Sequence, residues 1–123
     1  MFSKIVYFTL KFFVKNFFLE KALLALSMQK VRDSGKIALV TSRKLLNNIV
    51  TKPEQAKYRT INLENATIKK KITIKPGGMN VLIAAGFVRN EVEQTLVMSE
   101  KDVDVVWIQS VIDQAGVVVG KLS

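Results

Sequence analysis

The chain contains neither cysteine nor histidine among its 123 residues. Without cysteine it has no disulfide framework, no thiolate nucleophile and no thiolate ligand for a metal. Without histidine, catalytic triads and the zinc or haem sites that depend on an imidazole are excluded. No pair of carboxylates stands out as an acid–base couple, and Gly77-Gly78 lacks the spacing of a phosphate-binding loop. These absences predict a single-domain binding protein that is not an enzyme and uses no metal or cofactor.

The charge is basic overall and unevenly distributed. The formal net charge is +9, from 19 Lys and Arg against 10 Asp and Glu. Residues 28–75 hold twelve bases and three acids, whereas residues 76–123 hold three bases and six acids. Such a basic middle third indicates an anionic partner, which could be an acidic peptide, nucleic acid or a membrane surface. Specific nucleic-acid binding is not expected, because Tyr58 is the only aromatic residue near the run Lys69-Lys70-Lys71 for base stacking.

The first 27 residues differ in composition from the rest. Six of the seven Phe lie within the first eighteen positions, among mostly apolar neighbours. On a helix, Lys4, Lys11 and Lys15 would form a narrow basic stripe. Because lysines are costly inside a bilayer, the pattern favours an interfacial amphipathic helix over a spanning one. Two alternatives stay open: a signal-like leader, and an upstream start codon ahead of a protein that begins at Met28.

The remaining pattern predicts a helix-rich α+β domain over residues 28–116, with a small antiparallel sheet and a C-terminal tail at residues 117–123. Helices are expected at residues 36–51, 54–70, 79–85 and 102–116, and paired strands at residues 71–75 and 94–98. The helix at 54–70 is predicted because no Gly or Pro interrupts it and because Thr51 and Glu54 have the spacing of a capping box. Gly86 is expected just past the end of the helix at 79–85, with Phe87 folding back onto it.

The stretch 57–65 carries the most informative side chains. On a helical wheel, one arc of roughly 140° would hold Lys57, Tyr58, Ile61, Asn62 and Asn65. Such a mixture suits a peptide groove, because Ile and Tyr supply contact area, Asn amides hydrogen-bond a peptide backbone and Lys attracts a carboxylate. The alternative is that Tyr58 simply packs and Asn65 satisfies local backbone groups.

The run NNIVTKPEQAKYRTINLEN, followed by GGMNVLIAAGF and TLVM, resembles the PUB domain. The similarity covers residues 37–114 and comprises N-I-x3-P, K-Y-R-x-I-x3-N and G-F in this order. PUB domains occur in cytosolic peptide:N-glycanases, in UBA- or UBX-containing adaptors and in the catalytic subunit of the linear-ubiquitin ligase. The resemblance implies a PUB-like fold and a non-catalytic adaptor for the valosin-containing AAA ATPase, an unfoldase of ubiquitin-dependent degradation that includes the ER-associated branch.

The resemblance also implies where the partner binds. PUB domains hold the acidic, aromatic-ended C-terminal tail of that ATPase. By position, the family's groove helix corresponds to Lys57, Tyr58, Ile61 and Asn65, and the opposite wall to Gly86 and Phe87. Asn62 stands where glycanase-type members carry Arg, which removes a charged donor from the groove.

Two further expectations concern location and assembly. The resemblance implies a cytoplasmic monomer. The rival hypothesis is a peripheral membrane protein, in which residues 1–27 form the anchor and the basic middle third contacts anionic lipid.

Overall fold

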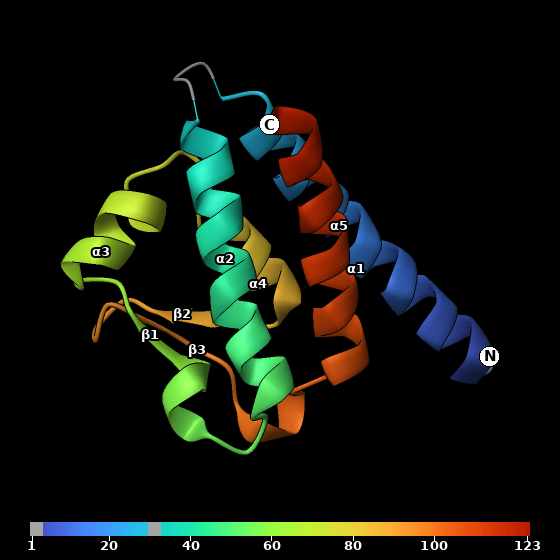
Figure 1. Cartoon of the computed structure of the whole chain (residues 1–123). Coiled ribbons are helices and arrows are strands. Elements are labelled where there is room, and N and C mark those ends of the chain that lie inside the picture. Colours follow the sequence, from blue (N-terminus) through green and yellow to red (C-terminus); the bar gives the residue numbers. More distant parts are fainter. Residues whose placement is uncertain (1–3, 30–32) are drawn as a thin grey trace.

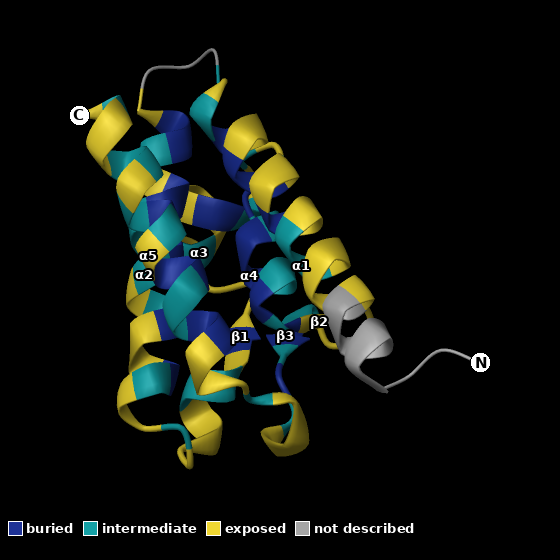
Figure 2. Cartoon of the chain, turned by 90° about the vertical axis from the view of Figure 1, so that its right-hand side faces the viewer, coloured by how far each residue is buried: buried dark blue, intermediate teal, exposed yellow. Residues whose placement is uncertain are grey.

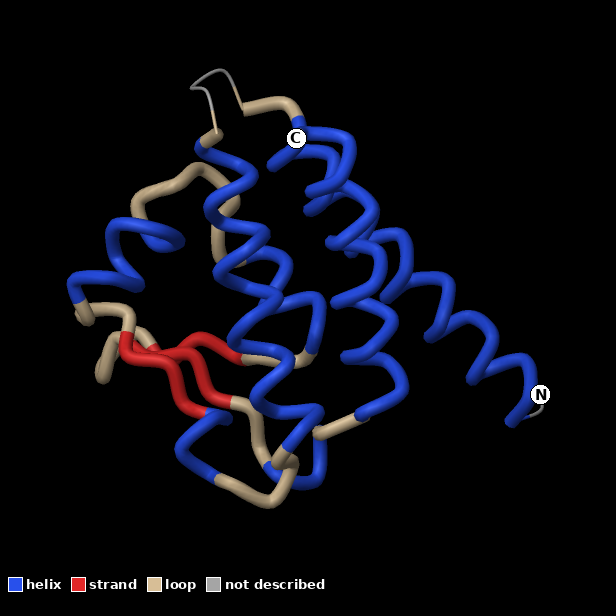
Figure 3. The backbone as a smooth tube through the Cα atoms, in the orientation of Figure 1, coloured by secondary structure: helices blue, strands red, loops and turns tan. Residues whose placement is uncertain are grey.

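A computed structural model describes residues 4–29 and 33–123 (Figure 1). Its α-helices are α1 (Lys4–Ser27), α2 (Ser34–Thr51), α3 (Ala66–Ile68), α4 (Asn80–Ala85) and α5 (Val105–Leu122). Two 3₁₀ turns, η1 (Ala56–Arg59) and η3 (Glu100–Asp102), and one π-helical turn, η2 (Lys69–Thr73), lie between them. A small sheet contains β1 (Thr60–Asn62), β2 (Val88–Asn90) and β3 (Thr95–Val97). The predicted helix-rich α+β class is confirmed, and Figure 3 shows the sheet at one end of the helical layer.

Helix α2 lies at the centre of the helical layer, with α5 along one side and α1 and α4 beside it (Figure 1). Its core-facing residues include Leu39, Leu46 and Ile49, which are completely buried. The helix predicted at 36–51 is confirmed and begins slightly earlier, at Ser34. At this start the helix passes very close to the end of α1, because a Cβ atom on Gly35 would overlap the carbonyl oxygen of Leu26.

The second half of α1 belongs to the same hydrophobic core as the rest of the chain. Leu19, Ala22, Leu23 and Leu26 are all buried there. The boundary after residue 27 stays a prediction, but in this structure the core extends across it.

Helix α5 continues past its predicted end. The expected stop at Gly116 is wrong, since the helix extends through the segment predicted as a tail to Leu122. Packing against the core stabilises the helical conformation of this segment, through Val118, Val119 and Leu122. Gly116 instead provides room for Arg43, whose Nη2 atom would lie 2.8 Å from an added Cβ and whose Nε donates to the carbonyl of Ile112.

The long helix predicted at residues 54–70 is wrong. The structure places η1, β1, α3 and the start of η2 over this range. Asn62 and Asn65 accept hydrogen bonds from backbone amides two and three residues downstream, and such bonds compete with helical ones. The expected capping box is also absent, because Thr51 ends α2 and its hydroxyl donates to the carbonyl of Asn47.

The strand predicted at residues 71–75 is wrong as well, because most of this segment belongs to η2. A bond of 3.0 Å from the Ile74 amide to the Lys69 carbonyl closes the turn. Ile72 is fully buried whereas Ile74 is 63% exposed, so their alternation does not mark one face of a strand.

The strand predicted at 94–98 is confirmed as β3, but its predicted partner is not. β3 is the central strand, antiparallel to β1 on one side and to β2 on the other. Leu96 and the opposite Ile61 are buried on the inner face, where the sheet meets the helices.

Candidate peptide-binding site

The two segments expected to form opposite walls meet at one end of the sheet. Thr60 at the start of β1 and Val88 at the start of β2 both lie opposite Val97 of β3. Tyr58, two residues before β1, and Phe87, directly before β2, therefore flank the same end of β3. The pairing of the strands brings the segments together although nearly thirty residues separate them.

Met98, directly after β3, connects the two walls. Its backbone amide donates to the carbonyl of Arg59 at 2.8 Å, and its carbonyl accepts a bond of 3.2 Å from Arg59 Nη1. On the other side its Cε atom would lie 3.3 Å from a Cβ placed on Gly86. Because Met98 is fully buried, these contacts hold both walls at a fixed separation.

Lys57 and Tyr58 supply a cation and an aromatic ring at the first wall. The Lys57 ammonium lies 5.1 Å from the centroid of the Tyr58 ring, within the range of a cation–π contact. Lys57 is exposed, and the half-buried Tyr58 packs against the core with part of its ring. This pair can offer both contact area and positive charge to a ligand, while the packing limits the movement of the ring.

Ile61 and Phe87 support the site from inside instead of lining its surface. Both are buried, with exposed fractions of 5% and 2%. Gly86, at the second wall, ends α4 with φ +126°, a conformation that favours glycine, and remains half-buried. The predicted capping role of Gly86 is therefore confirmed.

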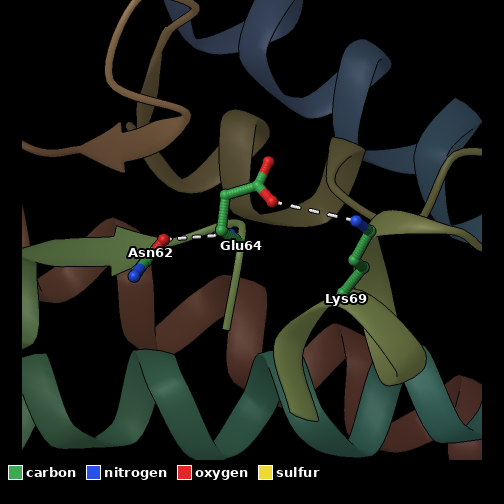
Figure 4. Close-up of polar contacts among 3 residues, drawn as sticks. All are labelled: Asn62, Glu64 and Lys69. Carbon is green, nitrogen blue, oxygen red and sulfur yellow. Dashed lines mark hydrogen bonds and ion pairs between the residues drawn. The ribbon is translucent and has the colours of Figure 1, made fainter. Parts of the chain in front are cut away.

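Asn62 and Asn65 lie toward the other end of β1, so the predicted helical arc is wrong. The Asn62 side-chain oxygen accepts from the Glu64 amide at 2.9 Å, and the Glu64 carboxylate lies 3.8 Å from the Lys69 ammonium (Figure 4). Asn65 caps α3, accepting from the amides of Thr67 and Ile68. Both carboxamide oxygens are thus engaged locally, as the structural alternative for Asn65 anticipated.

The amide nitrogens of Asn62 and Asn65 make no hydrogen bond within residues 4–29 and 33–123. Each side chain is exposed and can donate to a ligand through its NH₂ group while its oxygen holds the turn. A ligand that contacts both Tyr58 and Asn62 must span the end of η1 and the length of β1, a distance of about 11 Å from the rises of a 3₁₀ turn and a strand.

Val88 was missed by the sequence interpretation. It is 67% exposed and shares a row with Thr60 and Val97 on the outer face of the sheet, beside both walls. No local signal identifies it, because its position depends on which strands pair.

The described residues hold no cluster of three side chains that could bind a metal ion. Among them, α5 has the length and hydropathy of a membrane span. This is weak support for a span, because residues such as Ile108 and Val111 on one face of α5 pack in the core.

Comparisons with known proteins identify one family model and one curated relative. Residues 32–109 match the family model of the PUB domain. A curated relative, the peptide-N(4)-(N-acetyl-beta-glucosaminyl)asparagine amidase of Drosophila melanogaster, is 49% identical over 45 residues. That alignment covers 37% of this chain and only 7% of the relative. Both predicted walls lie inside the matched range, whereas α1 and the end of α5 lie outside it.

Proposed function

The chain belongs to the PUB domain family of protein-interaction modules, and from this premise we propose that it binds the acidic, aromatic-ended C-terminal tail of the valosin-containing AAA ATPase. It would act as a cytoplasmic, non-catalytic adaptor in ubiquitin-dependent degradation. The amidase activity of the relative is not proposed, because the aligned segment is a small part of that enzyme.

The observation that carries this proposal is the convergence of the two walls on Met98. An aromatic ligand side chain would pack on the ring of Tyr58, between η1 and the backbone at Gly86. The acidic residues before it would lie near Lys57, and backbone carbonyl groups of the peptide could accept from the NH₂ groups of Asn62 or Asn65. Since Asn62 contributes a neutral donor, more of the attraction for the acidic tail falls on Lys57.

A short peptide in such a site binds weakly, with a dissociation constant on the order of micromolar, or about −8 kcal/mol. Such an affinity is sufficient for an adaptor that meets an oligomeric ring displaying several tails, because the clustered tails raise the local concentration of binding partners. The basic middle third of the chain would accelerate the encounter with an acidic tail.

Fluorescence polarisation with a labelled acidic, aromatic-ended peptide tests the assignment. We expect Tyr58→Ala to abolish measurable binding and Tyr58→Phe to retain most of it. Lys57→Gln should weaken binding, whereas Lys121→Gln, which removes the same charge from the last turn of α5, should not. Circular dichroism confirms that each variant is folded. Unchanged affinity in folded Tyr58→Ala and Lys57→Gln variants would remove the site assignment.

A second function, peripheral membrane binding, is favoured by the outer face of α1. This face contains large apolar side chains that are 54–68% exposed: Leu10, Phe13, Val14, Phe17 and Leu24. Their three- and four-residue spacing forms one stripe opposite the buried residues of the same helix. Figure 2 shows the exposed positions along this side of α1. Such a stripe fits the interfacial region of a bilayer.

The lysines of α1 have different surroundings. Lys15 lies over the Trp107 ring at 5.7 Å and therefore faces the protein, whereas Lys21 lies over the exposed ring of Phe17 at 4.7 Å. Lys21 can extend from the apolar stripe toward lipid headgroups. Lys4 and Lys11, predicted in the same basic stripe as Lys15, have side chains outside the described part of the structure.

Vesicle co-sedimentation tests this second function. The full chain should pellet with phosphatidylcholine vesicles that contain phosphatidylserine, and Phe13→Ser with Phe17→Ser should abolish pelleting. The matched control is Val92→Ser with Val106→Ser, which alters two exposed apolar residues elsewhere. Equal pelleting of both double variants would exclude α1 as the anchor.

A further inference from the structure

A basic groove lies between the first half of α2 and the turn η2, away from Tyr58 and Gly86. Its volume is about 510 Å³, and its lining includes Lys36, Lys44, Lys70, Lys71 and Lys75. Ile37 and Val40 of α2 form an apolar floor between these lysines. We call this surface the lysine groove. At the rise of a helix, the end of α2 that leads to Tyr58 lies roughly 20 Å from Ile37 and roughly 10 Å from Lys44.

The positive charge of the lysine groove is not neutralised within the described part of the chain. None of its five lysines has a carboxylate within 4 Å there, and the ion pair that this part contains joins Lys69 to Glu64 instead. Asp33 is the sole acid in the lining. Several uncompensated lysines around a concave surface raise the local potential and attract an anionic ligand.

The π-helical turn produces this arrangement from three consecutive lysines. Ile72 is buried and anchors η2 against the core, while Lys69 is directed to Glu64. A π turn has more residues per turn than an α-helix, so the angle between consecutive side chains around the helix axis is smaller. Lys70 and Lys71 can therefore both line the groove. Lys69 is thus held in an ion pair, whereas Lys70 and Lys71 lie on an open surface.

We propose that the lysine groove is a second docking site, which binds an acidic segment of a partner protein that carries an aliphatic side chain. The aliphatic group would pack on Ile37, which is 39% exposed, and on Val40. Carboxylates on either side of it would lie near the lysines of the rim. The charge complementarity and the aliphatic floor together define the chemistry of the occupant.

Other anionic occupants fit this surface less well. The groove lining contains no aromatic ring for base stacking and no arginine for bidentate phosphate contacts, which disfavours nucleic acid. η2 and the first half of α1 lie on opposite sides of α2 in Figure 1, so a membrane that contacts α1 would not reach the groove. A second copy could offer Val92, 94% exposed between Glu91 and Glu93, but two carboxylates would leave most of the five lysines uncompensated.

The test is fluorescence polarisation with the full chain and a labelled, end-blocked peptide in which one Leu is flanked by Glu on both sides. Lys70→Gln with Lys71→Gln should weaken binding about three- to tenfold, because two exposed charges that attract the Glu side chains are removed. The matched control, Lys52→Gln with Lys101→Gln, removes the same net charge outside the groove lining and should change affinity less than about twofold. Ile37→Ser should also weaken binding, and the peptide with Gln in place of Glu should not bind.

The result separates this site from the proposed tail site. Tyr58→Ala should leave the affinity for the Glu–Leu peptide unchanged. The variant with Gln at positions 70 and 71 should leave the affinity for the aromatic-ended peptide unchanged. Equal losses in the groove variant and its charge-matched control would overturn the proposal. The proposal would also be overturned if an oligothymidylate or phosphatidylserine vesicles bound more tightly than the Glu–Leu peptide and this binding depended on Lys70 and Lys71. Concentration-dependent dimerisation that Glu91→Gln with Glu93→Gln abolishes would assign the groove to a second copy and also overturn it.

Discussion

The indole Nε1 of Trp107 donates a hydrogen bond of 2.9 Å to the backbone carbonyl of Ala84. This bond joins α5 to the last turn of α4, directly before Gly86. The same indole ring also contacts α1, where the Phe12 ring packs edge-on against it with centroids 6.2 Å apart. One side chain thus holds three helices together and sets the position of the second wall of the candidate site.

Trp107→Phe should lower the free energy of unfolding by about 1–3 kcal/mol. The substitution leaves the carbonyl of Ala84 without its partner in a partly buried position and fills less volume. Urea unfolding followed by circular dichroism measures the change. Gln109→Ala, on a half-buried position of the same helix away from this bond, serves as the control. Equal stability of Trp107→Phe and wild type would show that the bond to Ala84 contributes nothing.

Three glycine-to-alanine substitutions should differ in sign and size. Gly35→Ala should destabilise most, by about 3 kcal/mol or more, because its Cβ would overlap the Leu26 carbonyl oxygen. Gly86→Ala should cost about 1–3 kcal/mol, because φ is +126° and Met98 is close. Gly120→Ala has open space around it within α5 and should stabilise by up to about 1 kcal/mol. Thermal unfolding ranks the three variants, and a different order would contradict the helix contacts described above.

Deletion of residues 1–18 and deletion of residues 1–27 should have different outcomes. The longer deletion removes Leu19, Leu23 and Leu26, whose burial contributes roughly 5–9 kcal/mol, comparable with the whole stability of a small domain. We expect the shorter deletion to leave a cooperatively unfolding protein and the longer one to abolish cooperative unfolding. A stable, cooperative protein that starts at Met28 would instead show that α1 is dispensable for the fold.

Asn65→Ala and Asn65→Asp should separate capping from ligand binding. Alanine removes the acceptor for the amides of Thr67 and Ile68, which should cost about 1 kcal/mol of stability. Aspartate keeps an acceptor at the helix start and should preserve stability, but it replaces the NH₂ donor by a charge that repels an acidic tail. Weaker peptide binding by a fully stable Asn65→Asp variant would support direct contact. If Asn65→Asp binds normally, Asn65 acts only as a cap.

Local signals in the sequence were reliable for elements whose conformation depends mainly on neighbouring residues. The apolar spacing of α2, the alternation of β3 and the glycine after α4 each predicted an element that the structure contains. The helix predicted at 54–70 failed because the lack of Gly and Pro permits a helix without requiring one. The local bonds of Asn62 and the pairing of Ile61 with Leu96 outweighed helix propensity there.

The candidate site was likewise predictable only in its residue types and not in its geometry. The side-chain types of Lys57, Tyr58 and Gly86 and their family pattern were visible in the sequence, but the helical arc expected to align them was wrong. The two walls meet because β1 and β2 pair with opposite edges of β3, and a single sequence does not specify such long-range pairing.

The absence of cysteine and histidine, the basic middle third and the PUB motif were determined by the sequence alone, because each depends only on which residues are present and in what order. The tertiary structure decided which of those residues are available to a partner. It buried Ile61 and Phe87, directed Lys15 toward Trp107 and divided the lysine run between Glu64 and an open groove. The physical reason is that exposure and charge pairing depend on packing between distant segments, and these contacts form only when the helices and the sheet assemble.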